Sequence, residues 1–219
     1  AAKQALDLDP DSGHAWTARG YYLWTRERDW LGAEEAVSRA LQLDPDDPHI
    51  LILAAEYHRM LGRLEEATAS LDRLAGLGLT PPYAQLLRAG IELSRAEHGE
   101  TDLDLPLQRL DAVLEEEPSD GLAHLWRAIA LYNTDRREEI LAAVETSLQI
   151  NPDIPLAHGY RGAVLARWGR RGEAMEEDAW FRAEDERAPV DRFCWGFLRL
   201  ALGDLDGGFG LMMEGVREY

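Results

Sequence analysis

Prolines recur along this chain at an interval that constrains its fold more than any other feature. Those that close a phrase such as ALDLDP or ALQLDP are Pro10, Pro45, Pro118 and Pro152, and those that open a segment are Pro48, Pro82, Pro155 and Pro189. The interval is 35 residues for the first closing pair and 34 for the last, and 34 for the first and last opening pairs. Proline is tolerated in the first turn of a helix and just past its end, but not inside it. The two sets therefore predict helix–helix junctions that repeat along the chain.

The segments between these junctions have helical patterns. Residues 121–133 align with residues 155–167 without a gap, and both carry an arginine followed by a small residue. The second segment of a unit begins with carboxylates, as at Glu34, Glu65 and Glu138. Carboxylates in a first turn complement the helix dipole. Each repeat is therefore expected to be a helix, a short turn and a second helix.

This pattern resembles the tetratricopeptide repeat (TPR), a 34-residue helix–turn–helix unit. Trp16 and Gly20 match its large and small positions in the first helix, Ala33 and Ala67 match the small position of the second helix, and Pro45 matches its closing proline. The resemblance implies an all-α, right-handed superhelical solenoid of antiparallel helix pairs that forms one domain over residues 1–219. The expected parts are a half-unit at 1–12 and units at about 13–47, 48–81, 82–120, 121–154, 155–188 and 189–219.

The family uses one face of the first helices for binding. Carrying its pattern over gives thirty concave positions, of which three are charged, against 29% of the whole chain. An apolar strip of this kind indicates a protein partner if it is exposed. The predicted groove, which would bind an apolar or amphipathic segment of a protein or peptide, contains Tyr21, Trp24, Ile52, Tyr83, Leu86, Leu125, Ile129, Tyr132, Phe193 and Phe197. The alternative is that some of these residues belong to the core.

An arginine occupies one equivalent position in four units. The four residues are Arg19, Arg88, Arg127 and Arg161. A guanidinium beside a helix-pair core must find carboxylates or carbonyls, because burying it unpaired is costly. We expect these residues to join neighbouring units, and a row of anion sites is the alternative.

Composition excludes several classes of function. The chain has 41 Asp and Glu against 23 Lys and Arg, a net charge of −18, which argues against nucleic acid or an anionic membrane as the main partner. Its histidines lack metal-ligand spacing, and Cys194 lies on an apolar, aromatic helix face. Neither a phosphate-binding glycine loop nor a nucleophile elbow is present.

We therefore expect a non-catalytic, cytoplasmic interaction scaffold without a cofactor, a metal ion or a membrane-inserted segment. Two alternatives stay open. The chain could be a structural module that self-associates as a homo-oligomer through its ends or its glycine-rich last helix. It could instead be a regulatory TPR appendage of a larger bacterial signalling enzyme or transcriptional regulator.

Overall fold

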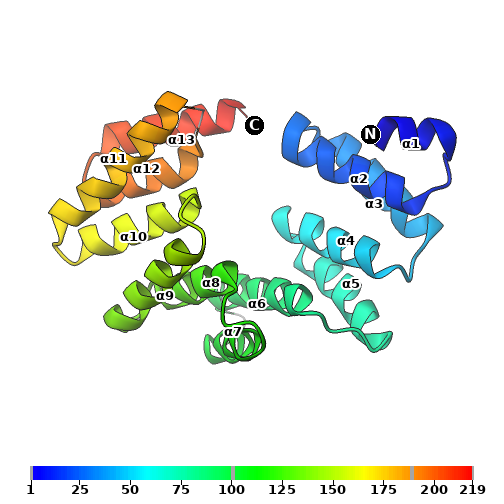
Figure 1. The fold of residues 1–219 in the computed structure, drawn as a ribbon, viewed down its shortest axis with the longest axis horizontal. Coiled ribbons are helices and arrows are strands. Elements are labelled where there is room, and N and C mark those ends of the chain that lie inside the picture. The colour runs from blue at the N-terminus through cyan, green and yellow to red at the C-terminus, as the bar shows by residue number, and fades with distance from the viewer. Residues whose placement is uncertain (1, 100–101, 188–189, 219) are drawn as a thin grey trace. The chain divides into compact units, whose positions relative to one another are not determined.

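The computed structural model describes residues 2–99, 102–187 and 190–218, and it is built from helices (Figure 1). They are α1 (Ala2–Leu8), α2 (Gly13–Tyr22), the π-helical turn η1 (Leu23–Glu27), α3 (Trp30–Leu43), α4 (Pro48–Met60), α5 (Leu64–Gly76), α6 (Pro82–Glu97), α7 (Asp104–Glu116), α8 (Gly121–Leu131), α9 (Arg137–Ile150), α10 (Pro155–Arg167), α11 (Arg171–Arg187), α12 (Arg192–Ala201) and α13 (Leu205–Glu218). These three ranges contain no strand, which confirms the all-α class and the solenoid of helix pairs.

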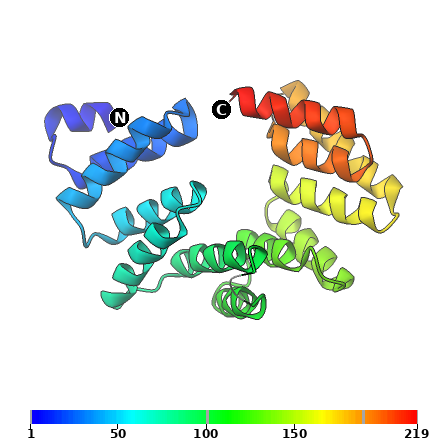
Figure 2. The same ribbon diagram turned by 180° about the vertical axis from the view of Figure 1, so that it is seen from behind.

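The chain divides into two compact units, Ala1–Arg109 and Leu110–Tyr219, which are described separately. In both, successive helices pack as pairs, such as α4 with α5 and α10 with α11, an arrangement that is also visible from behind (Figure 2). We call the first helix of a pair helix A and the second helix B. The single domain over residues 1–219 and its repeat boundaries stay predictions, and Pro189, expected to open the last repeat, lies outside the described residues.

Junction carboxylates and turn glycines set where the helices begin and end. The Asp120 side chain accepts hydrogen bonds from the Leu122 and Ala123 backbone N–H groups, at 2.9 and 3.0 Å, and so caps α8. Between helices A and B, Gly62 and Gly169 adopt φ of +71° and +78°, which favours glycine. Part of the chain's acidity therefore serves helix capping.

The extra residue in the first proline interval coincides with a change of helix type. α2 continues into η1, and the next residue, Arg28, caps it in the left-handed conformation with φ of 57°. A π-helical turn holds one more residue than an α-helical turn. The wider turn directs Trp24 into the core, where its ring centroid lies 5.3 Å from that of Tyr57 on α4.

Small and large side chains alternate in the cores of both units. In the N-terminal unit, Ala33, Ala36 and Val37 of α3 pack with Ala54 and Tyr57 of α4. In the C-terminal unit, the buried cluster contains Leu165, Ala174, Phe181, Cys194, Leu198 and Leu202. Each cluster includes residues from two successive helix pairs, so stacking of the pairs buries the apolar surface.

Gly196 of α12 marks a close approach to α13, which leads to a stability prediction. A Cβ atom there would lie 2.8 Å from the Gly208 carbonyl oxygen, a backbone atom that no rotamer change can move. Gly196→Ala should lower the free energy of unfolding by about 1–3 kcal/mol because the helices must separate. Urea unfolding measures this, with Gly172→Ala of α11 as control, since its Cβ meets no atom within 4 Å. Equal stability of the two variants would contradict the close packing.

Candidate partner-binding surface

The ten residues predicted to line a groove divide into two groups by burial. Seven retain solvent-accessible surface, namely Tyr21, Ile52, Tyr83, Ile129, Tyr132, Phe193 and Phe197. Tyr21 and Phe193 are among the more exposed, at 50% and 39%. Four of the seven lie on or directly after α8 and on α12 of the C-terminal unit, and three lie on α2, α4 and α6 of the N-terminal unit.

Trp24, Leu86 and Leu125 are buried, and their assignment to an exposed groove was wrong. Trp24 turns inward in the π-helical turn. Leu86 and Leu125 occupy the fifth position of their helices A, the position that Gly159 occupies on α10. There a Cβ atom would lie 2.9 Å from the Cys194 carbonyl oxygen of α12, so α10 and α12 approach closely at this position. Ile52 occupies the same position of α4 and stays partly exposed, so the packing around each helix decides burial here. The alternative that some predicted groove residues belong to the core applies to Leu86 and Leu125.

Three aromatic rings from three different helices A meet in the C-terminal unit. Tyr132 follows α8, Tyr160 lies on α10 and Phe197 lies on α12. Their centroids are 5.4 Å apart for Tyr132 and Tyr160, 5.2 Å for Tyr160 and Phe197, and 5.8 Å for Tyr132 and Phe197. We call these three residues the aromatic cluster. All three are partly exposed, and Phe193 lies one helical turn before Phe197.

Arg167 fixes one edge of the aromatic cluster. Its guanidinium carbon lies 5.6 Å from the Tyr132 ring centroid, and its Nη1 donates a hydrogen bond of 2.9 Å to the Tyr132 carbonyl oxygen. Burial raises the pKa of the Tyr132 hydroxyl, and the arginine opposes this. The ring therefore stays neutral at physiological pH and offers apolar surface beside a cation. The sequence analysis placed Tyr132 on the groove but missed Tyr160, which lies one position after Gly159.

The partly exposed residues of the N-terminal unit form a more polar surface. Burial raises the pKa of the Tyr83 hydroxyl above its usual value, and the Glu56 carboxylate, which hydrogen-bonds it, raises it further. The Tyr21 ring packs edge-on against Trp24 at 5.3 Å. This surface contains charged and hydrogen-bonded groups, so the aromatic cluster is the more apolar of the two.

Three of the four repeated arginines bind carboxylates on the preceding helix B. Arg88 pairs with Asp72 at 2.8 Å, Arg127 with Asp111 at 2.8 Å and Arg161 with Glu145 at 3.3 Å. Each carboxylate lies sixteen residues before its arginine, so the pattern was present in the sequence. These distances favour the prediction that the arginines join successive helix pairs, over the alternative that they form a row of open anion sites.

The pairing of a repeated arginine with a carboxylate sixteen residues earlier changes at Arg19 and on α12. Sixteen residues before Arg19 the chain has Lys3, so the same pairing cannot extend to Arg19. On α12 the equivalent residue is Trp195, whose indole N–H donates a hydrogen bond of 2.8 Å to Asp178 on α11. Asp178 is almost completely buried and also accepts from Arg199 at 3.3 Å. A neutral donor has replaced the arginine here, but the partner is still a carboxylate.

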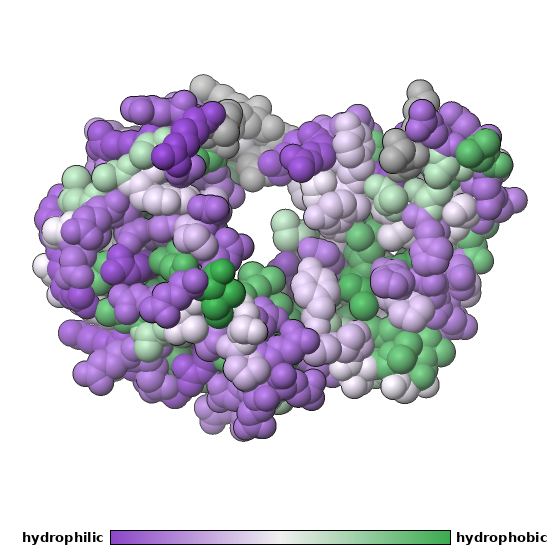
Figure 3. Space-filling view, viewed as in Figure 1, coloured by the Kyte–Doolittle hydropathy of each residue, from purple (hydrophilic) through white to green (hydrophobic). Residues whose placement is uncertain are grey.

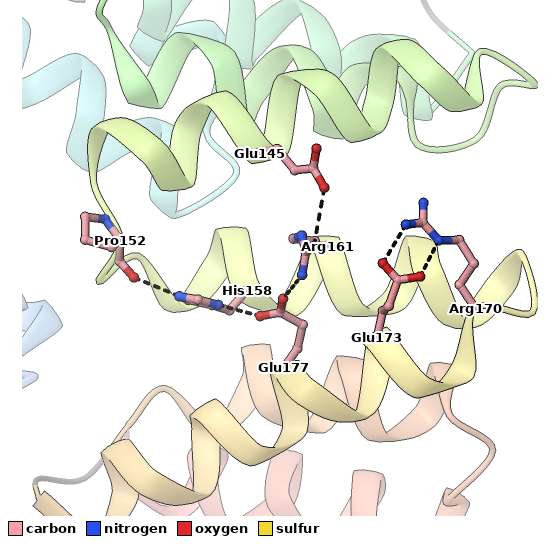
Figure 4. A network of polar contacts seen from close by, with 7 residues as sticks. All are labelled: Glu145, Pro152, His158, Arg161, Arg170, Glu173 and Glu177. Carbon is pink, nitrogen blue, oxygen red and sulfur yellow. Dashed lines mark hydrogen bonds and ion pairs between the residues drawn. The ribbon is translucent and has the colours of Figure 1, made fainter.

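Arg161 belongs to a second network, which connects α9, α10 and α11 (Figure 4). The buried Glu177 carboxylate binds the Arg161 guanidinium and faces His158 Nδ1 at 2.5 Å. His158 Nε2 lies 2.8 Å from the Pro152 carbonyl oxygen, and the imidazole stacks on Trp180 with centroids 3.7 Å apart. Both ring nitrogens thus lie within hydrogen-bond distance of an oxygen atom, which fixes the orientation of the imidazole. This arrangement holds helices together and leaves Glu177 no room for a ligand.

The other titratable and nucleophilic side chains do not form a further candidate functional site. Hydrophilic residues cover most of the face seen in Figure 3, with smaller apolar areas between them. Cys194 is buried, and burial raises the pKa of its thiol above the usual range. Across the described residues, no group of three or more His, Cys, Asp or Glu side chains is placed to hold a metal ion. None of the helices in this part of the chain is long and apolar enough to cross a membrane.

Comparisons with known proteins point to one family. Two models described as tetratricopeptide repeat match residues 25–91 and 1–48. No curated protein matches the chain. Among solved structures, a thermophilic TPR protein of Thermus thermophilus, TTC0263, has a TM-score of 0.74 at 20% identity, over 87% of this chain and 99% of its own.

Two further structures show the same fold. Cut9–Hcn1, a hetero-tetramer of APC/C, gives a TM-score of 0.72 at 13% identity, over 99% of this chain and 42% of that one. YrrB, described as a TPR protein with an unusual peptide-binding site, gives 0.50 at 14% identity, over 97% and 98%. At these identities the likeness concerns the fold alone.

Proposed function

Because this chain is a tetratricopeptide-repeat protein, we propose that it is a non-catalytic module that binds an apolar or amphipathic segment of a partner protein on its helices A. The observation that carries the proposal is the aromatic cluster of Tyr132, Tyr160 and Phe197, partly exposed on three successive pairs. Aromatic residues dominate the binding energy of protein interfaces. The peptide-binding site in the description of YrrB supports the same use of the fold.

Binding would bury an apolar side chain of the partner against Phe197 and the exposed face of Phe193. The rings of the aromatic cluster already pack against one another, so little side-chain freedom is lost when the partner binds. Arg167 holds the Tyr132 ring and carries a positive charge at the edge of the cluster. An amphipathic segment with a carboxylate near its apolar face would therefore fit better than one with a cation there.

The chain's charge supports a protein rather than a nucleic acid as this partner, because the net charge of −18 repels phosphate. The proposal includes a cytoplasmic location and the absence of a cofactor. A regulatory appendage of a larger enzyme would use the same surface, since TPR arrays of either kind act by binding protein segments.

A peptide selection tests the proposal directly. A displayed random-peptide library panned against the chain should enrich peptides with apolar residues three and four positions apart. Phe197→Ala and Phe193→Ala should each weaken the enriched peptides about 30-fold, which corresponds to about 2 kcal/mol. Isothermal calorimetry measures this, and circular dichroism checks that the variants fold.

Tyr22→Ala provides the matched control, because Tyr22 is an exposed aromatic residue on α2 of the other unit. Its affinity for the enriched peptides should equal that of the unaltered chain. Enriched peptides that bind Phe197→Ala and Phe193→Ala with undiminished affinity would refute the proposed site.

A further inference from the structure

His124 and His158 occupy the same position in two successive repeats and are held in the same way. They lie 34 residues apart, at the fourth position of α8 and of α10. His158 Nε2 lies 2.8 Å from the Pro152 carbonyl oxygen (Figure 4). His124 Nε2 lies 2.9 Å from the Pro118 carbonyl oxygen. Because the same ring nitrogen makes the same contact, the surroundings of the two imidazoles can be compared directly.

The two histidines differ in what covers them. The indole of Trp180 stacks on the His158 imidazole, with centroids 3.7 Å apart and 17° between the ring planes. The residue 34 positions before Trp180 is Thr146 on α9. The Glu177 carboxylate faces His158 Nδ1, and 34 positions before it the chain has Ala143. In the earlier repeat, therefore, α9 offers neither an indole nor a carboxylate at these positions.

A groove of about 330 Å³ lies where these two larger side chains are absent. His124, Ala143 and Thr146 line it, together with Leu114 of α7. Its volume falls at the lower end of the range for ligand pockets, about 300–1,000 Å³. The His124 side chain is partly exposed. The groove therefore has room for a planar ring on the imidazole, in the place that Trp180 takes in the next repeat.

Thr146 is the smallest residue at its position among the repeats that align without an insertion. The equivalent residues are Arg39, Arg73, Trp180 and Glu214. Arg39 borders a second groove, beside Trp16, but its guanidinium is bound to Asp11 at 2.9 Å. A long charged side chain thus occupies the equivalent place in the first repeat. The groove at His124 is the one in which a short residue replaces the side chain that would cover the ring.

The charged groups at this groove already bind one another. Arg127 pairs with Asp111 at 2.8 Å and with Glu139 at 3.2 Å. Glu139 also pairs with Arg136, at 2.6 Å. A charged ligand would have to break one of these pairs. Stacking on the imidazole and apolar contact with Leu114 remain, and both favour an uncharged aromatic ring.

We propose that the groove beside His124 binds a tryptophan side chain of a partner protein, stacked on the imidazole as Trp180 stacks on His158. The groove is open to solvent, so it can accept the ring while the chain that carries it continues outside. This site shares no residue with the aromatic cluster. Either site can therefore fail its test while the other stands.

A nuclear magnetic resonance titration with the peptide acetyl-Gly-Trp-Gly-amide tests the proposal. The Hε1 proton of His124 should move upfield and the shift should saturate, because the ring current of a stacked indole shields this proton. Acetyl-Gly-Leu-Gly-amide, which is apolar but lacks a ring, should bind at least about fivefold more weakly. A His124 signal that the tryptophan peptide leaves unmoved at about 10 mM, or equal affinity for both peptides, overturns the proposal.

Thr146→Trp should fill the groove from within the chain. Its indole should cover His124, so the Hε1 signal should lie upfield before peptide is added, and the affinity for the tryptophan peptide should fall at least about 30-fold. Leu31→Trp is the control, since Leu31 is 86% exposed on α3 of the other unit. It should bind like the unaltered chain. Undiminished binding by a folded Thr146→Trp variant overturns the proposal.

His124→Ala provides a second test that does not enlarge a side chain. It removes the stacking surface and should weaken the tryptophan peptide at least about fivefold, as read from the Thr146 methyl signal. Phe197→Ala, in the aromatic cluster, should leave the titration at His124 unchanged. Unchanged binding by His124→Ala would show that the imidazole does not hold the ring and would refute the stacked arrangement.

Discussion

Glu177→Ala is expected to lower the free energy of unfolding by about 3–5 kcal/mol, a large fraction of the stability of a typical domain. The Glu177 carboxylate is buried between the Arg161 guanidinium and His158 Nδ1. Removing it leaves a partly buried cation without its closest anion and opens a void between the helices. Urea unfolding followed by circular dichroism provides the measurement.

Two further substitutions at this site separate charge from shape. Glu177→Gln keeps an acceptor for Arg161 and supplies an amide donor for His158 Nδ1, while His158 Nε2 still donates to the Pro152 carbonyl oxygen. Glu177→Gln should therefore lower the free energy of unfolding much less than Glu177→Ala does. Glu176→Ala on the exposed neighbour should change stability by less than about 0.5 kcal/mol. Equal losses for Glu176→Ala and Glu177→Ala would contradict the buried network.

The fold was predictable because the residues that begin and end its helices act locally. Proline at a helix start, a carboxylate at a cap and glycine with positive φ each act within a few residues, so their spacing showed the helix pairs. The repeated arginines were also visible, and so were their partners, since Asp72, Asp111 and Glu145 stand sixteen residues before them. A repeat with a fixed period converts contacts between helices into a constant sequence distance.

The groove was predictable only in part, because exposure depends on how closely helices approach. Trp24 has the aromatic character of a binding residue, yet the π-helical turn directs it onto Tyr57. Leu86 and Leu125 occupy the same helix position as the partly exposed Ile52, and the packing around each helix decides which of them is buried. Sequence position alone cannot distinguish such a residue from the partly exposed Ile129 one turn further on.

The buried carboxylates were hidden in the sequence for a related reason. Residues 173–178 read EAMEED, which is typical of a solvated acidic face. In the structure Glu177 and Asp178 are buried on two sides of α11, while Glu176 is exposed. Asp178 accepts from Arg182 four residues on, but the other donors, on α10 and α12, lie sixteen or more residues away and include a tryptophan N–H. A charge pattern within one helix does not reveal such partners.

Asp178→Ala should be the other substitution with a large effect, at about 3 kcal/mol, and its effect should be local. Asp178 accepts from the Trp195 indole N–H and from Arg199, both on α12. Without it, the Trp195 indole N–H loses its acceptor and Arg199 is left with the Asp204 carboxylate, at the junction between α11 and the last helix pair. Repeat arrays are held together by contacts between neighbours, so the terminal pair should open first.

Hydrogen exchange with mass spectrometry distinguishes this opening from global unfolding. In Asp178→Ala, amide protection should fall most in α12 and α13 and remain in the N-terminal unit. Glu177→Ala should instead weaken protection in α10 and α11, because Glu177 faces the helix on the other side. Adjacent carboxylates on one helix would thus hold different neighbours. Uniform loss of protection over the whole chain in both variants would show that the two junctions do not open separately.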